Sequence, residues 1–207
     1  MIDRLHFISS ETEEISHIAS IEKALDAGCR WIQLRVKGQS EDEVFNLAQN
    51  AKQLCERYQA KLIINDYPNV AQRINADGLH LGLTDMTIRE ARNIVGNAMV
   101  IGGTANTHED VLARIKEGAN YVGLGPYRFT TTKANLSPVL GLQGYMTILN
   151  SLKDQGSSIP IIAIGGITSA DVDELISNGI YGVAMSNGIL QTKNPKKTVS
   201  QIHQILC

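Results

Sequence analysis

Two aspartates stand at equivalent points of the chain, each soon after a short apolar segment. Asp66 follows residues 62–64, and Asp85 follows Gly78–Leu81. If these segments are neighbouring strands, the two carboxylates lie on adjacent loops at one edge. Carboxylates about 4 Å apart repel by roughly 4 kcal/mol at an effective dielectric constant near 20, a cost that protonation or a shared divalent cation removes. Oxygen ligands of this kind favour Mg2+, completed by phosphate oxygens and water.

Each aspartate also has a simpler interpretation. Asp66 can be a turn residue ahead of a proline. Asp85 can cap a helix, although Thr87 and Glu90 already have the spacing of a capping box two residues later. His80 lies in an apolar segment, so we interpret it as a buried, hydrogen-bonded histidine and not as a metal ligand.

Basic side chains follow the apolar segment Trp31–Leu34. Alternate residues of an extended chain share a face, so Gln33, Arg35 and Lys37 are expected to point the same way. Arg can bind a phosphate through two parallel hydrogen bonds, and Lys adds a point charge. The cluster therefore favours a multiply charged phosphate ligand, while a solvated strand end is the alternative.

The longest segment without an apolar pattern runs from about residue 125 to 140. It contains Thr130, Thr132 and Lys133, whose hydroxyls and ammonium group can donate to a phosphate or carboxylate. Long loops in compact domains are usually functional, so we predict a lid over the site, with a plain surface loop as the alternative.

Two turns near the carboxyl terminus contain small and polar residues and lead toward helices. Gly166 lies in the sequence AIGGIT, and Ser186 and Asn187 lie in MSNGI. Backbone N–H groups at helix starts attract phosphate, and in an eightfold barrel the loops after the last two strands form the usual phosphate site. The turns indicate a phosphate but do not identify the reaction.

These residues need a scaffold, and the apolar pattern predicts one. Stretches with apolar residues three and four apart, typical of amphipathic helices, separate most of the short apolar or β-branched segments. The alternation predicts an α/β protein with a (β/α)8 TIM barrel, forming a single domain over residues 1–207. The predicted strands are Leu5–Ile8, Trp31–Leu34, 62–64, Gly78–Leu81, 99–101, Tyr121–Leu124, Ile161–Ile164 and Gly182–Met185.

Capping signals support the same division. Ser40 with Glu43 has capping-box spacing, and Gly28, Gly118 and Gly179 stand shortly before predicted strands, where a glycine can end a helix. An open flavodoxin-like or Rossmann-like sheet is the alternative fold. It normally has fewer repeats, and no G-x-G-x-x-G motif opens a helix here.

The amino-acid composition argues against some classes of binding partner. The 207 residues are 43% hydrophobic and 19% charged, with a formal net charge of −2, which argues against disorder and against a nucleic-acid partner. We find no apolar run of membrane-spanning length and no secretory leader, so we expect a cytoplasmic protein without membrane contact. Cys29, Cys55 and Cys207 lack metal-ligand spacing and are expected to be reduced and structural.

Taken in order, the motifs resemble those of thiamine phosphate synthase, and the resemblance covers nearly the whole chain. They are QLRVK (33–37), ND (65–66), HLGLTD (80–85), GLGP followed by TTTK (123–133), AIGGIT (163–168) and MSNGI (185–189). The resemblance implies a Mg2+-dependent transfer that joins 4-amino-2-methyl-5-hydroxymethylpyrimidine diphosphate to thiazole phosphate or its carboxylate. Thiamine phosphate and diphosphate are the products, and diphosphate leaves before the thiazole nitrogen attacks. It also suggests a homodimer.

The resemblance assigns roles residue by residue. Gln33 and Thr104 would lie at the pyrimidine, and Asp66 and Asp85 would hold Mg2+. The diphosphate ligands would be Arg35, Lys37 and Asn65; the lid residues would be Thr130, Thr132 and Lys133; the thiazole phosphate ligands would be Gly166, Ser186 and Asn187. The residues expected to act on the reaction itself are Arg35, Thr104 and Lys133.

The chain departs from the family pattern at a few positions. Leu83 replaces a residue that is often Gln, and residues 127–129 differ from the commonest loop sequence. Asn106 stands where a related thiazole tautomerase of the same fold has a catalytic histidine. His108, two residues beyond, keeps that isomerase open as an alternative. A non-catalytic thiamine-pathway regulator would need the phosphate loops but neither the aspartate pair nor the lysine.

Overall fold

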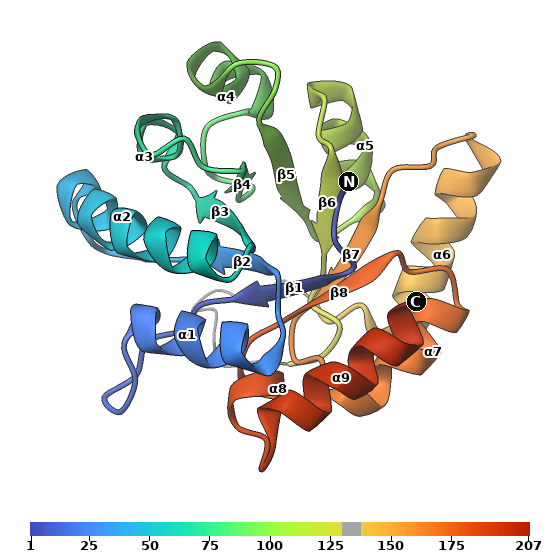
Figure 1. The fold of residues 1–207 in the computed structure, drawn as a ribbon. Helices are drawn as coiled ribbons and strands as arrows, with labels where there is room; N and C mark the ends of the chain where they lie inside the picture. The colour runs from blue at the N-terminus through green and yellow to red at the C-terminus, as the bar shows by residue number, and fades with distance from the viewer. Residues whose placement is uncertain (130–137) are drawn as a thin grey trace.

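The chain folds into a closed barrel of eight parallel strands, with β1 paired to β8. The structure, a computed structural model, describes residues 1–129 and 138–207. Figure 1 shows the strands at the centre and the helices around them. The strands are β1 (Leu5–Ile8), β2 (Trp31–Leu34), β3 (Lys61–Asn65), β4 (Gly78–Leu81), β5 (Val100–Ala105), β6 (Tyr121–Leu124), β7 (Ile161–Ile164) and β8 (Gly182–Met185). The predicted (β/α)8 barrel is confirmed, and the open-sheet alternative is wrong.

Helices connect the strands and cover the outside of the barrel (Figure 1). In chain order they are α1 (His17–Ala27), α2 (Glu41–Arg57), α3 (Pro68–Arg73), α4 (Ile88–Val95), α5 (His108–Glu117), α6 (Gly141–Asp154), the 3-10 turn η1 (Ser169–Asp171), α7 (Val172–Ser177), α8 (Asn187–Leu190) and α9 (Pro195–Leu206). In the described part of the chain, none of these helices has the length and apolar character needed to cross a membrane.

The helix ends follow the predicted signals. Ser40 with Glu43 and Thr87 with Glu90 form complete capping boxes at the starts of α2 and α4. Gly28 ends α1 in the left-handed conformation, with φ of 112°, which a side chain would disfavour. These local signals determine where each of these helices begins or ends.

The two faces of the strands contribute to two separate apolar clusters. Outward side chains pack under the helical ring in the larger cluster. Inside the barrel, a smaller cluster contains Trp31, Ile63, Tyr121, Ile162 and Ala184. This inner cluster fills the barrel, so the interior is a packed core and not a pore.

The fifth strand differs from its prediction. We expected residues 99–101, and β5 instead runs from Val100 to Ala105. The prediction ended too early because glycine is depleted in strands, and Gly102 and Gly103 lie in the middle of this one. A Cβ atom at Gly102 would lie 2.1 Å from the Tyr121 ring, so glycine makes room for a buried aromatic side chain. Thr104 is therefore part of the strand.

We expect Gly102→Ala to lower the free energy of unfolding by about 3 kcal/mol, because Tyr121 is fully packed and cannot move aside. Urea denaturation followed by circular dichroism measures the change. Gly38→Ala is the control: its Cβ meets nothing within 4 Å, so it carries only the backbone cost of a positive φ, about 1 kcal/mol. An equal loss in the two variants would contradict the prediction.

Candidate active site

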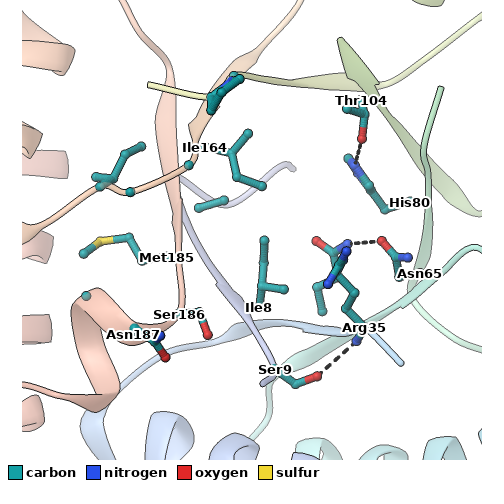
Figure 2. Close-up of a pocket in the computed structure, with 18 of the residues that line it drawn as sticks. Ile8, Ser9, Arg35, Asn65, His80, Thr104, Ile164, Met185, Ser186 and Asn187 are labelled. Atoms are coloured by element: carbon teal, nitrogen blue, oxygen red, sulfur yellow. Dashed lines mark hydrogen bonds between the residues drawn. The ribbon is translucent and has the colours of Figure 1, made fainter. Parts of the chain in front are cut away.

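A cavity of about 420 Å3 opens at the carboxyl ends of the strands. Figure 2 shows two polar walls: Asn65, His80 and Thr104 lie on one side, and Ser186 and Asn187 lie on the other. Apolar side chains lie between these walls. The predicted site residues that line this cavity are Gln33, Arg35, Asn65, Thr104, Gly166, Ser186 and Asn187.

The inner apolar cluster determines which side chains face the cavity. Residues two positions apart on a strand point to the same side. Trp31 lies in the inner cluster, and Gln33, two residues further on β2, therefore lines the cavity above it. Ile63 and Asn65 have the same relation on β3. Packing below the cavity thus orients the polar groups above it.

On the first wall, two buried amides fix each other. Gln33 Nε2 donates a 2.6 Å hydrogen bond to Asn65 Oδ1. Both side chains are buried, and each is held in a single orientation by the other. They present an ordered polar edge to a ligand.

His80 connects this wall to the barrel interior. Its Nδ1 lies 3.1 Å from the Tyr121 hydroxyl, and its Nε2 lies 3.0 Å from Thr104 Oγ1. The histidine is buried and hydrogen-bonded, as predicted, and it also lines the cavity, which we had not expected. The contact fixes the hydroxyl of Thr104 at the cavity surface.

The second wall offers a hydroxyl that needs a partner. Ser186 Oγ is buried and has no hydrogen-bond partner among residues 1–129 and 138–207. Buried polar groups are nearly always hydrogen-bonded, so a ligand acceptor would satisfy this hydroxyl. The helix that follows, α8, has only four residues, and therefore side-chain and backbone donors matter more here than a helix dipole.

Asp66 and Asp85 come together at the carboxyl ends of β3 and β4, where their side chains are close enough to hydrogen-bond when one of them is protonated. Burial, together with the bond to Asp85, raises the pKa of Asp66 to about 6. Burial alone would raise the pKa of Asp85 as well. The bond with Asp66 and a 2.6 Å bond from the Gly82 N–H lower it instead. The neighbouring carboxyl group of Asp85 is thus part of what makes Asp66 harder to ionise than a free aspartate.

Asp66 and Asp85 suit a divalent cation whose remaining ligands are water and oxygens of a bound substrate. Within the described ranges, no group of three or more His, Cys, Asp or Glu side chains could hold a metal ion. Mg2+ is commonly held by one or two carboxylates and completes its shell with water and phosphate oxygens. A cation bound between the two carboxylates would offset the repulsion between them. The donor set fits Mg2+ accompanied by a phosphorylated substrate.

The two predicted cations separate in the structure. Arg35 lines the cavity, and its backbone N–H donates to Ser9 Oγ at 3.0 Å. Lys37 forms an ion pair with Asp66 and is not part of the cavity wall. Because β2 ends at Leu34, strand alternation does not extend to Lys37, and its shared role with Arg35 stays a prediction.

The two candidates for a catalytic residue of the tautomerase lie in different places. Asn106 lines the cavity and donates a side-chain hydrogen bond to the Gly125 carbonyl. His108 starts α5, and its Nε2 contacts Ser151 Oγ on α6 at 3.0 Å. His108 is not a lining residue, so a shift of alignment does not bring a histidine to the tautomerase position.

Three predicted lid residues, Thr130, Thr132 and Lys133, lie outside the described residues. Their roles stay predictions. The loop residue before them, Phe129, lines the cavity with its side chain largely exposed.

Sequence reasoning missed Arg114, a buried arginine on α5. Its guanidinium donates to Gly82 O at 2.7 Å, to Thr104 O at 3.1 Å and to Glu117 Oε2 at 2.8 Å. It therefore ties the loop that carries Asp85 to the strand that carries Thr104. Gly103 makes room for this side chain, because a Cβ atom there would lie 2.7 Å from Arg114 Cδ.

The chain is similar to proteins of one family over nearly its whole length. The sequence profile described as thiamine monophosphate synthase matches residues 5–189. The thiamine-phosphate synthase of Flavobacterium psychrophilum is 50% identical over 206 residues, covering 100% of each chain. That of Bacteroides fragilis is 47% identical, covering 97% of this chain and 98% of the relative.

A solved structure agrees. The thiamine phosphate pyrophosphorylase from Pyrococcus furiosus superimposes with a TM-score of 0.81 at 28% sequence identity. The match covers 98% of this chain and 95% of the other.

We expect Arg114→Ala to lower the free energy of unfolding by about 3 to 5 kcal/mol, since it leaves Glu117 unpaired and two carbonyls without their donor. Arg114→Lys should recover only part of this, because a single ammonium cannot reach all three acceptors. Chemical denaturation measures both. Arg89→Ala, at an exposed position of α4, should change stability by less than about 1 kcal/mol. A similarly small loss for Arg114→Ala would refute its bridging role.

Proposed function

The chain belongs to the thiamine monophosphate synthase family, and from that premise we propose which reaction its cavity performs. It is a transferase that moves a pyrimidinylmethyl group from 4-amino-2-methyl-5-hydroxymethylpyrimidine diphosphate to the ring nitrogen of a thiazole phosphate and releases diphosphate. When the acceptor is the thiazole phosphate carboxylate, CO2 is released as well. The observation that carries the proposal is the close pairing of Asp66 and Asp85 at the strand ends, next to a cavity with two polar walls.

The two walls suit the two substrates. We assign the pyrimidine ring to the wall with Gln33 and Thr104, where fixed amide and hydroxyl groups can bind ring nitrogens and the amino group. We assign the thiazole phosphate to Gly166, Ser186 and Asn187, where a buried hydroxyl needs an acceptor. A volume of about 420 Å3 is within the range of small-molecule sites.

The chemical demand of this transfer is electrostatic. As the carbon–oxygen bond to diphosphate breaks, negative charge accumulates on the leaving group and positive charge on the pyrimidinylmethyl carbon. Bound by Asp66 and Asp85, Mg2+ would supply charge neutralisation at the diphosphate. Arg35, Lys37 and Lys133, the last of which lies outside the described residues, would stabilise the departing diphosphate more than the bound substrate, which lowers the barrier.

The second step needs alignment more than acid–base chemistry. The thiazole nitrogen already carries the electron pair that forms the new bond, so no general base is required. Holding the two rings on facing walls turns the attack into an effectively intramolecular step. Thr104, whose hydroxyl is fixed by His80, would orient the pyrimidine for that attack.

The two alternatives receive no specific support. A tautomerase would not need the acidic pair, and its catalytic histidine position is occupied by Asn106. A non-catalytic regulator would not need Asp66 and Asp85 to share a site. A cytoplasmic location and a homodimer stay predictions that rest on the sequence.

We expect the purified protein, incubated with both substrates and Mg2+, to form thiamine phosphate and diphosphate in equal amounts, detected by mass spectrometry. Omission of Mg2+ after treatment with a chelator should stop product formation. If thiamine phosphate does not form in the complete mixture, the proposed function is wrong.

Asp66→Asn and Asp85→Asn should each reduce Mg2+-dependent kcat/KM by at least about a hundredfold, because charge neutralisation at the leaving group is lost. Calorimetric titration with Mg2+ in the presence of diphosphate should show weakened metal binding. Asp154→Asn, at the exposed end of α6, is the matched control and should behave as wild type. Wild-type metal affinity in both site variants would reject the shared site.

A further inference from the structure

The segment after β6 lies directly against the glycine turn after β7. The Tyr127 N–H donates to Ile164 O at 2.9 Å, and the Arg128 N–H donates to Gly165 O at 3.0 Å. A Cβ atom at Gly166 would lie 2.4 Å from Arg128 Cγ, and Gly166 has a φ of 67°. The two loops therefore interlock, and glycine is required at the contact.

The Arg128 side chain adds a second connection. Its Nη1 and Nη2 donate to Asp171 Oδ2 and Oδ1, both at 2.7 Å, and Nη1 also donates to Gly166 O at 3.0 Å. Asp171 in turn accepts hydrogen bonds of 2.7 Å from the Thr168 N–H and hydroxyl. One guanidinium thus holds the glycine turn to the start of the α7 region.

This ion pair differs from an ordinary surface pair. Exposed pairs contribute little because both side chains lose entropy and solvent screens the charges. Here Asp171 is only 11% exposed, the pairing is bidentate, and the guanidinium lies 4.9 Å from the centre of the Tyr127 ring. Burial alone would raise the pKa of Asp171, but its bonds to Arg128 and Thr168 lower it, so the carboxylate is charged and firmly bound at neutral pH.

The turn that Arg128 holds is part of the cavity. Gly165, Gly166 and Ile167 line it on the side of Ser186. The two turns also touch, because a Cβ at Gly188 would lie 2.4 Å from Ile167 O. A shift of the glycine turn would therefore change the distance between its backbone groups and the Ser186 hydroxyl.

We propose that Arg128 is a positioning residue that sets the glycine turn Gly165–Gly166 at the correct distance for the phosphate of the thiazole substrate. The proposal rests on the proposed function, because it assigns that phosphate to this wall. Arg128 acts through Gly166 and Asp171 and not on the reacting atoms.

The first test is substrate-selective kinetics and binding. Arg128→Ala should raise both KM and the calorimetric Kd for thiazole phosphate roughly tenfold, while KM for the pyrimidine diphosphate changes less than about twofold. Arg128→Lys keeps the charge but loses the bidentate pairing, and should show an intermediate effect. Arg73→Ala is the matched control: its side chain is 46% exposed, against 45% for Arg128, and it pairs with a carboxylate away from the cavity.

The second test is a double-mutant cycle with Asp171→Asn. If Arg128 and Asp171 hold the glycine turn only through their ion pair, the double variant should bind thiazole phosphate no more weakly than Arg128→Ala alone. Equal weakening for both substrates, additive effects in the cycle, or an unchanged Kd in a folded Arg128→Lys would each overturn the proposal. Wild-type protein that binds thiazole phosphate but forms no product would reject the proposed function, and the Kd comparison would still decide the role of Arg128. Wild-type protein that does not bind it at all would overturn both.

Discussion

The packed layer inside the barrel is the constraint on which the rest of the structure depends. Trp31, Ile63, Tyr121, Ile162 and Ala184 pack together inside the barrel. Because strand side chains alternate, the residues two positions further along must face the open end of the barrel. The apolar filling therefore holds the strands together and also aims the polar side chains. A change in register on one strand would remove both effects at once.

Above that layer, the polar groups of the site satisfy only part of their hydrogen-bonding and charge requirements with one another. Gln33 and Asn65 pair with each other, and His80 bonds to Thr104. The acidic pair is different, because burial and the neighbouring carboxyl group of Asp85 raise the pKa of Asp66 and so oppose its ionisation. Ser186 lacks a partner within the part of the chain that the structure describes. A cation and a phosphate are the ligands that would relieve these two costs, which is why the geometry agrees with the chemistry of the family.

Two arginines hold the loops that carry the site. Arg114 is buried, and its guanidinium links the ends of β4 and β5. Arg128 is more exposed, and its guanidinium links the loop after β6 to the turn after β7. Both use the planar, several-donor geometry of guanidinium to bond backbone carbonyls and a carboxylate at once, which lysine cannot do. Loop position in this barrel is thus set by a few directed bonds in addition to packing.

The sequence by itself determined the barrel, because strand and helix periodicity and capping signals are local and agree with one another. It also determined which residue types lie at the strand ends, including Asp66, Asp85 and Arg35. Only the tertiary structure decided that Lys37 pairs with Asp66, that β5 continues through Gly102 and Gly103, and that His80 faces the cavity. The contacts of Arg114 and Arg128 were likewise decided only by the tertiary structure. Each of these depends on contacts between segments far apart in the chain, and the distance across a barrel is not encoded in any local pattern of residues.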